Sequence, residues 1–117
     1  MLNSALFAII EEAGSAVMIM TEEVERQEFL ASRLTRREVQ RQLLIIAGCT
    51  GNLAPDARQL LPELPWDGWY TVAQELNNAN TTVDDLLWFS VRSLVPATLM
   101  WLQVYRQNQP ELFTFTV

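Results

Sequence analysis

The polar residues that could do chemistry are concentrated between two apolar runs, from Gln74 to Asp85. Their carboxylate and amide side chains can form hydrogen bonds, and the carboxylates also carry charge. Asn and Thr compete with the backbone for hydrogen bonds, so the cluster favours a turn over a helix interior. The alternative is the polar surface of a binding pocket. The residues predicted to contribute to such a binding site are Gln74, Glu75, Asn77, Asn78 and Asn80.

Three nearby carboxylates, Glu75, Asp84 and Asp85, suggest an acidic site as an alternative. Their spacing is not diagnostic of a metal site. Asp84 and Asp85 precede an apolar helical run, where acidic residues suit the helix dipole, and Thr82 with Asp85 resembles a capping box. We therefore expect helix capping and a solvated face, and we predict no metal ion and no cofactor.

Several reactive side chains are scarce or absent. The chain has no His and no Lys, and all eight basic residues are Arg. The single Cys49 cannot form an internal disulfide, which indicates a reducing compartment, and without an imidazole to activate it we expect a buried, inert thiol. Glu11 and Glu12 interrupt the apolar N-terminal stretch, which argues against a signal peptide and a spanning helix. We expect a cytoplasmic protein.

The formal net charge of −6 disfavours binding to a nucleic-acid backbone or an anionic membrane through overall charge. Five of the eight arginines nevertheless lie close together, between Arg26 and Arg41. We expect a solvated helix face on which these arginines pair with acidic neighbours. The predicted acidic neighbours are Glu22, Glu23, Glu25, Glu28 and Glu38.

The apolar pattern predicts one all-α domain over residues 1–117, an up-and-down bundle of four to five helices. Thr21 is a candidate cap for a helix over residues 22–31, and Thr35 with Glu38 forms a capping box for the next helix, whose apolar face is Val39, Leu43, Ile46 and Ala47. Pro55 fits the first turn of a short helix over residues 56–61, and the rigid corner Leu64-Pro65-Trp66 should hold the indole of Trp66 against the bundle. Pro96 should kink the last long helix or divide it in two. The tail from Pro110 alternates apolar and polar residues and is expected to be an extended arm.

Helical spacing predicts a buried face on the first and the last helix. For the first helix it comprises Leu2, Leu6, Ile9, Ile10, Ala13, Val17 and Met20. For the last it comprises Val83, Leu86, Leu87, Val91 and Leu94, continued by Ala97, Met100, Trp101 and Val104. Other apolar residues lie off these faces, which favours a partner surface and a homodimer, unless a small bundle simply surrounds its central helix. These residues are Phe7, Met18, Ile19, Trp88, Phe89 and Leu102.

A string of segments in the chain resembles the HepT-like family of the HEPN superfamily. The segments are FLASRLTRREVQRQLLIIAG at 29–48, LAPDARQLLPELPW at 53–66, VDDLLW at 83–88 and the later Leu94-Val95-Pro96. The resemblance covers most of residues 29–96 and lies mainly on scaffold positions. It implies a helical bundle whose relatives act as ribonucleases, some of them paired with a nucleotidyltransferase.

The family's chemistry depends on an Arg, a His a few residues later, and a Tyr two residues beyond the His. The resemblance assigns the Arg to holding the scissile phosphate, the His to proton transfer and the Tyr to accepting AMP from the partner. Aligned from Pro65-Trp66, these positions hold Ala73, Asn78 and Asn80, and Gln74 follows the Arg position. No His exists in the chain and no Arg lies between Arg58 and Arg92, so small alignment errors change nothing.

Two hypotheses of function follow. The preferred one is a non-catalytic, dimeric HepT-like binding protein that pairs with a nucleotidyltransferase in a toxin–antitoxin-like system, with no catalytic residue. The alternative is a ribonuclease toxin that uses other residues, such as Arg92 with Glu75 or an Asp. A free-standing dimer with an unrelated partner is a third possibility.

Overall fold

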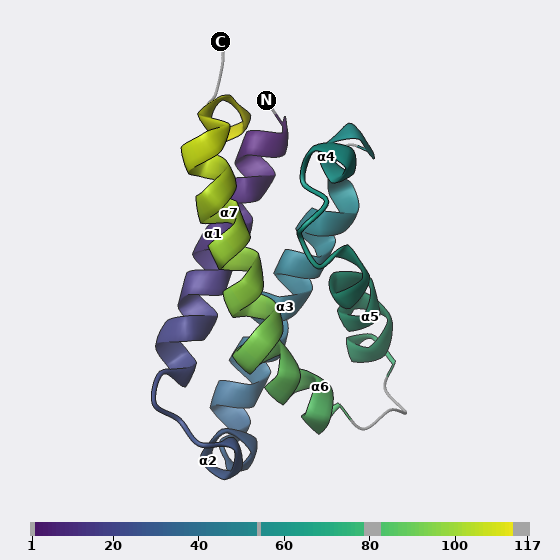
Figure 1. Ribbon diagram of the computed structural model, residues 1–117. Helices are drawn as coiled ribbons and strands as arrows, with labels where there is room; N and C mark the ends of the chain where they lie inside the picture. The colour runs from purple at the N-terminus through teal and green to yellow at the C-terminus, as the bar shows by residue number, and fades with distance from the viewer. Residues whose placement is uncertain (1, 54, 79–82, 114–117) are drawn as a thin grey trace.

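Four helical passes run alternately up and down and form the bundle (Figure 1). The computed structural model describes residues 2–53, 55–78 and 83–113. Within these ranges there is no strand, and the predicted all-α up-and-down bundle is confirmed. The helices are α1 (Leu2–Thr21), α2 (Arg26–Ala31), α3 (Arg33–Asn52), α4 (Pro55–Leu60), α5 (Trp66–Leu76), α6 (Asp84–Phe89), the π-helical η1 (Ser90–Leu94), α7 (Val95–Asn108) and the 3₁₀-helical η2 (Pro110–Phe113).

Helix α3 contacts α1 on one side and α5 on the other, and α7 packs along α1 (Figure 1). The predicted buried positions of α3 are confirmed, because Val39, Leu43, Ile46 and Ala47 all lie in the core. Apolar residues at three- and four-residue spacing give a helix one buried stripe. Helix α3 is therefore the scaffold on which α5, and with it the predicted site, is positioned.

Most of the predicted buried face of α1 is confirmed, because Ile10, Ala13 and Val17 lie in the core, but the face differs at two positions. Phe7 is buried, whereas Ile9 is 42% exposed. A Cβ atom on Gly14 would lie 2.8 Å from Cδ2 of Leu99 on α7, so α1 and α7 approach closely on the side that Gly14 occupies. Phe7 also packs against Phe113 of η2, with ring centroids 4.9 Å apart. The close approach at Gly14 and the packing of Phe7 against Phe113 turn the buried face slightly from the predicted one, toward Phe7 and away from Ile9.

Two predicted caps are wrong. Thr21 ends α1 and donates to the carbonyl of Val17, and α2 begins only at Arg26 after a turn at Glu23 with a positive φ of 58°. Helix α3 begins at Arg33 and is capped by Ser32, whose hydroxyl oxygen accepts the backbone N–H of Thr35 at 3.4 Å. Ser32 is the cap because it is the single extended residue between α2 and α3, and an N-cap residue has this non-helical backbone conformation.

The π-helical turn η1 changes which residues of the last pass are buried. The backbone N–H of Val95 bonds to the carbonyl of Ser90, five residues earlier, directly before Pro96. A π-turn holds one more residue than an α-turn, so buried positions beyond it move one residue along the chain. The core holds Thr98, Leu102 and Tyr105, not the predicted Ala97, Trp101 and Val104, and Met100 is exposed. The predicted interruption at Pro96 is thus a π-turn in a continuous pass.

The tail also differs from the prediction. Residues 110–113 form the 3₁₀ helix η2, which packs against α1 and α7, so the described part of the tail is not an extended arm. Residues 114–117 lie outside the described ranges. Of the apolar residues predicted to be surplus to the core, Phe7 and Leu102 are core residues, and Trp88 packs against Phe29. Met18, Ile19 and Phe89 remain exposed.

The segment Ser4–Thr21 of α1 is long and apolar enough, by length and composition alone, to cross a membrane. Glu11 and Glu12 do not remove it from that class by composition, and the expectation that it does not span a membrane stays a prediction. A core helix of a globular bundle meets the same criteria, and α1 packs along α3 and α7. Glu11 also forms an ion pair with Arg106 of α7, which gives that carboxylate a partner inside the bundle.

Candidate functional site

The predicted site residues lie at the C-terminal end of α5. Asn77 is the C-cap, and its Nδ2 donates to the carbonyl of Ala73 at 2.7 Å. The backbone N–H of Asn78 donates to the carbonyl of Glu75 at 3.2 Å. These bonds satisfy carbonyl groups that every helix leaves unpaired at its end, so Asn77 and Asn78 terminate α5 as the turn interpretation predicts. Asn80 lies outside the described residues, as does Thr82 of the predicted capping box.

A groove lies beside these residues, one to two turns earlier on α5. It has a volume of about 340 Å³. We call it the α3–α5 groove. It is lined by Ala47, Thr50 and Gly51 of α3, Arg58 of α4, and Trp66, Asp67, Trp69, Tyr70 and Ala73 of α5. Of the predicted positions, only Ala73, which aligns with the family Arg, lines it; Gln74, Glu75, Asn77 and Asn78 do not.

Two indoles in the groove are fixed by hydrogen bonds. Trp66 Nε1 donates to the carbonyl of Leu61 at 3.0 Å, which confirms that the Leu64-Pro65-Trp66 corner holds this side chain against the bundle. Trp69 Nε1 donates to Thr98 Oγ1 at 2.9 Å in the core. An indole has a single hydrogen-bond donor, its Nε1–H, so a hydrogen bond from that group fixes the orientation of the ring. The groove therefore has rigid aromatic walls, and the sequence signal for it is the aromatic run that follows Pro65.

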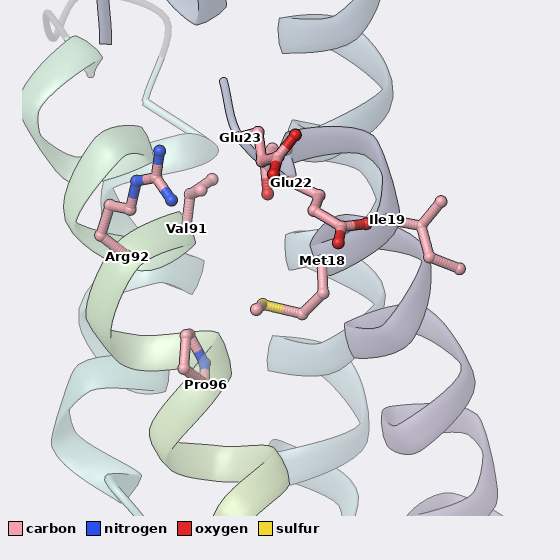
Figure 2. Close-up of a pocket in the computed structure, with 8 residues that line it drawn as sticks. Met18, Ile19, Glu22, Glu23, Val91, Arg92 and Pro96 are labelled. Atoms are coloured by element: carbon pink, nitrogen blue, oxygen red, sulfur yellow. The ribbon is translucent and has the colours of Figure 1, made fainter. Parts of the chain in front are cut away.

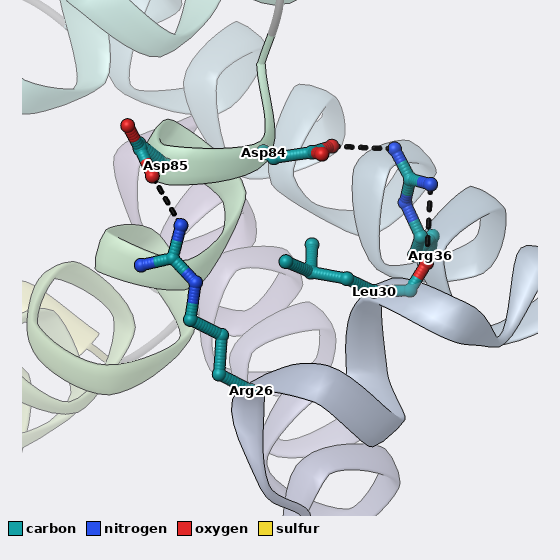
Figure 3. Close-up of polar contacts among 5 residues, drawn as sticks. All are labelled: Arg26, Leu30, Arg36, Asp84 and Asp85. Atoms are coloured by element: carbon teal, nitrogen blue, oxygen red, sulfur yellow. Dashed lines mark hydrogen bonds and ion pairs between the residues drawn. The ribbon is translucent and has the colours of Figure 1, made fainter.

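Asp84 and Asp85 do not face this groove, because arginines of α2 and α3 bind them (Figure 3). Arg36 donates to Asp84 at 2.6 Å and to the carbonyl of Leu30 at 3.2 Å. Arg26 forms an ion pair with Asp85. Two of the five clustered arginines therefore pair across the fold with aspartates. Among the described residues, Glu38 is the one predicted glutamate partner that forms an ion pair, with Arg41. Sequence spacing reveals local pairs only, and these partners are 48 and 59 residues apart.

Arg92 also lies away from Glu75. It donates to the carbonyl of Val24 and stacks on Trp88, with the guanidinium carbon 4.5 Å from the ring centroid. Figure 2 shows Arg92 across a hollow of about 510 Å³ from Glu22 and Glu23. Met18 points into this hollow and Ile19 points away from it (Figure 2). The carboxylates of the alternative catalytic pairing, Glu75, Asp84 and Asp85, are absent from the described contacts of Arg92.

The pKa values of three titratable groups, Glu38, Arg41 and Cys49, depart clearly from their ordinary values. Arg41 and, more weakly, Gln42 donate hydrogen bonds to Glu38 and lower its pKa to about 2, and the same bond raises the pKa of Arg41. Burial raises the pKa of the Cys49 thiol, as expected for an inert cysteine. Among the described residues, no group of three or more His, Cys, Asp or Glu side chains could hold a metal ion. The α3–α5 groove itself offers aromatic rings, the guanidinium of Arg58 and the carboxylate of Asp67.

The chain is similar in sequence to a protein of Thermococcus cleftensis named "Probable ribonuclease HepT". The two are 32% identical over 89 residues, which cover 75% of this chain and 81% of that protein. No family model matches the chain, and no solved structure matches it. A likeness of this extent spans most of the bundle and is not confined to one motif. The chain therefore belongs to the HepT family.

Proposed function

We propose that this chain is a non-catalytic HepT-family protein, a homodimeric binding module that pairs with a nucleotidyltransferase in a toxin–antitoxin-like system in the cytoplasm. The observation that carries the proposal is the complete absence of His, together with the absence of Arg between Arg58 and Arg92. Asn78, at the aligned His position, does not exchange a proton near neutral pH. RNA cleavage by the chemistry of the family's ribonucleases would therefore be lost.

The contacts of the remaining charged groups support this proposal. Asp84 and Asp85 are neutralised by Arg36 and Arg26, and Arg92 donates to a backbone carbonyl and stacks on an indole. A general base and a phosphate-holding cation must lie within hydrogen-bond reach of the same reacting group. The described contacts of Arg92 include neither Glu75 nor Asp84 nor Asp85, so the pairing that the alternative ribonuclease needs is not assembled.

Exposed apolar side chains support the partner part of the proposal. Ile19 of α1 is 74% exposed and Phe89 of α6 is 51% exposed. Exposure of a large apolar side chain to water is unfavourable, and burial in an interface removes this cost. We assign Ile19 and Phe89 to contacts with a second copy.

Light scattering tests the dimer. We expect twice the 13.4 kDa mass of one chain, and a shift to the monomer mass in Ile19→Glu and Phe89→Glu. Leu34→Glu is the control, because Leu34 is an exposed apolar residue of α3 that is not assigned to the interface, so the same change of charge there should leave the dimer intact. A monomeric wild type, or dissociation in all three variants alike, would contradict the assignment.

Affinity capture of the tagged chain from its native cells tests the pairing. We expect a nucleotidyltransferase to co-purify in a fixed ratio and to survive a wash in high salt. Recovery of the dimer alone, or with an unrelated protein in fixed ratio, would contradict pairing with a nucleotidyltransferase and support the free-standing dimer.

A further inference from the structure

Arg33 and Arg37 of α3 are the two arginines to which the described part of the chain gives no partner. The other six form ion pairs or stack on indole rings; they are Arg26, Arg36, Arg41, Arg106, Arg58 and Arg92. Arg33 and Arg37 are both exposed and lie one turn apart on α3. Like charges at this spacing repel each other, and basic residues at the start of a helix oppose its dipole. Two uncompensated guanidiniums in a chain of net charge −6 therefore indicate an anion from outside the chain.

A hollow of about 210 Å³ lies among these guanidiniums. All its lining residues carry N–H donors in their side chains; they are Arg33, Arg36, Arg37 and Gln40. Arg36 is held in place by its hydrogen bonds to Asp84 and to the carbonyl of Leu30. A guanidinium forms strong hydrogen bonds with an ionised acceptor and can bind both oxygens of a carboxylate side by side. The hollow therefore has the donors that a carboxylate needs.

A second hollow, of about 470 Å³, adjoins the first, because Arg37 and Gln40 line both. It adds the side chains of Leu34 and Leu44. Leu34 is 82% exposed, the largest exposed fraction among the described large apolar residues. Water is a poor environment for such a side chain, and a partner that covers it removes the cost of exposure. Aliphatic surface and free guanidiniums therefore lie next to each other on α3.

We call the surface of these two hollows the outer face of α3; its unpaired and apolar residues are Arg33, Leu34, Arg37 and Leu44. An occupant needs anions spaced one helical turn apart and aliphatic groups beside them. A helix with carboxylates at positions i and i+4 and an adjacent aliphatic stripe meets both requirements. We propose that the outer face of α3 docks an acidic amphipathic helix of a protein partner, with its carboxylates on the two arginines and its aliphatic side chains on the two leucines.

A nucleic acid matches this face less well. Single strands bind where bases stack on aromatic rings, and none of the described residues that line the two hollows is aromatic. Glu38 places a carboxylate beside the guanidiniums, and the net charge of −6 disfavours a phosphate backbone. The dimer contacts proposed above lie at Ile19 and Phe89, and neither residue lines these hollows. The inference rests on the proposed pairing with another protein and assigns the surface for it.

Affinity capture from native cells tests the outer face of α3 with two variants. Arg33→Gln with Arg37→Gln, and separately Leu34→Glu, should each reduce the amount of co-purified nucleotidyltransferase about tenfold or more. The controls are Arg58→Gln and Leu60→Glu, which make the same changes at exposed residues of α4 outside this face and should retain the partner. Full retention of the partner by both variants of the face would overturn the docking surface and leave the pairing intact.

Light scattering and circular dichroism accompany the capture. Both variants of the face should keep the mass of the dimer and the helical bundle, because they replace exposed side chains. A shift of the folded double variant Arg33→Gln with Arg37→Gln to the monomer mass would assign the face to a second copy and overturn the proposal.

A defined probe tests the same chemistry on the purified full chain, whatever the cells yield. The probe is a labelled helical peptide with Leu at its core positions and Glu at flanking i and i+4 positions, and fluorescence anisotropy measures its binding. We expect the Glu peptide to bind about tenfold more tightly than the same peptide with Gln. Arg33→Gln with Arg37→Gln should abolish this preference. The charge exchange Arg33→Glu with Arg37→Glu should transfer it to a peptide with Lys at the Glu positions.

The peptide results decide the surface separately from the pairing. Equal affinities of the wild type for the Glu and Gln peptides would overturn the proposal. Tighter binding of a pentauridylate than of the Glu peptide would also overturn it and assign the face to nucleic acid. If the wild type captures no nucleotidyltransferase but prefers the Glu peptide in this charge-dependent manner, the docking surface is supported and only the proposed partner is wrong.

Discussion

The indole Nε1 of Trp69 donates a hydrogen bond to Oγ1 of Thr98 at 2.9 Å, and Thr98 donates in turn to the carbonyl of Leu94 at 2.8 Å. Both side chains are buried, so neither can exchange this partner for water. The bond joins α5, which carries one wall of the α3–α5 groove, to α7. The position of the groove wall therefore depends on a polar contact inside an apolar core.

Thr98→Val should destabilise the fold, because it preserves the shape of the side chain and leaves the N–H of Trp69 unsatisfied. A buried donor without a partner costs about 1–3 kcal/mol of unfolding free energy. Urea denaturation measures the difference. Thr71→Val is the control, since Thr71 is exposed on α5 and its hydroxyl bonds only to the carbonyl of Asp67, so a change below about 0.5 kcal/mol is expected. Equal effects of the two substitutions would contradict the role of Thr98.

The Arg36–Asp84 pair should stabilise the attachment of α6 to α3. The side chains are 33% and 40% exposed, so solvent screening limits the expected coupling free energy to about 0.5–1 kcal/mol. A double-mutant cycle with Arg36→Gln and Asp84→Asn measures it, and 1 M NaCl should reduce it. The same cycle on Arg26 and Asp85, whose side chains are more exposed, should give a smaller value. A larger coupling at Arg26–Asp85 would reverse the ranking derived from burial.

Glu23 adopts a positive φ of 58° in the turn between α1 and α2. The left-handed region costs a residue with a Cβ atom roughly 1–2 kcal/mol, and glycine avoids most of that cost. Glu23→Gly should therefore raise the unfolding free energy by about 0.5–1 kcal/mol, after allowance for the greater freedom of glycine in the unfolded chain. Glu22→Gly, one residue earlier, relieves no strain and should lower stability. Thermal denaturation of both variants distinguishes strain relief from a general effect of glycine.

The Glu38–Arg41 pair predicts a specific dependence of stability on acid. The folded pKa of Glu38, about 2, lies below its ordinary value of 4.5, so the contribution of its ionised form is complete above pH 4.5 and is lost as the pH falls toward 2. The difference in urea midpoint between wild type and Glu38→Gln should shrink between pH 6 and pH 3. The effect is small because the pair is solvent-exposed. A difference that stays constant with pH would show that Glu38 acts through packing and not through charge.

Local sequence patterns predicted the helices because apolar spacing and prolines act over a few residues. The core face of α3 and the short helix after Pro55 are examples. The prediction for α1 failed only at Phe7 and Ile9, because the exact rotation of the helix depends on the close approach of Gly14 to Leu99, which is a tertiary contact. The one-residue displacement of the core after Ser90 was wrong because a π-turn leaves no distinct apolar signature.

The site was predictable only in part. Asn77 behaves as the turn interpretation predicts. The α3–α5 groove was missed because Arg58 and Tyr70 come from two helices, and neither residue indicates a site by its own spacing. The aspartates looked available because their arginine partners are distant in sequence.

A ribonuclease assay of the purified chain tests the central claim most directly. Wild type, Arg92→Ala and Asn78→His should all leave RNA intact, since none of them contains both a phosphate-holding Arg at position 73 and a His at position 78. Only the double substitution Ala73→Arg with Asn78→His has the residues to regain cleavage. Cleavage by the wild type that Arg92→Ala abolishes would contradict the account and identify this HepT-family chain as an enzyme.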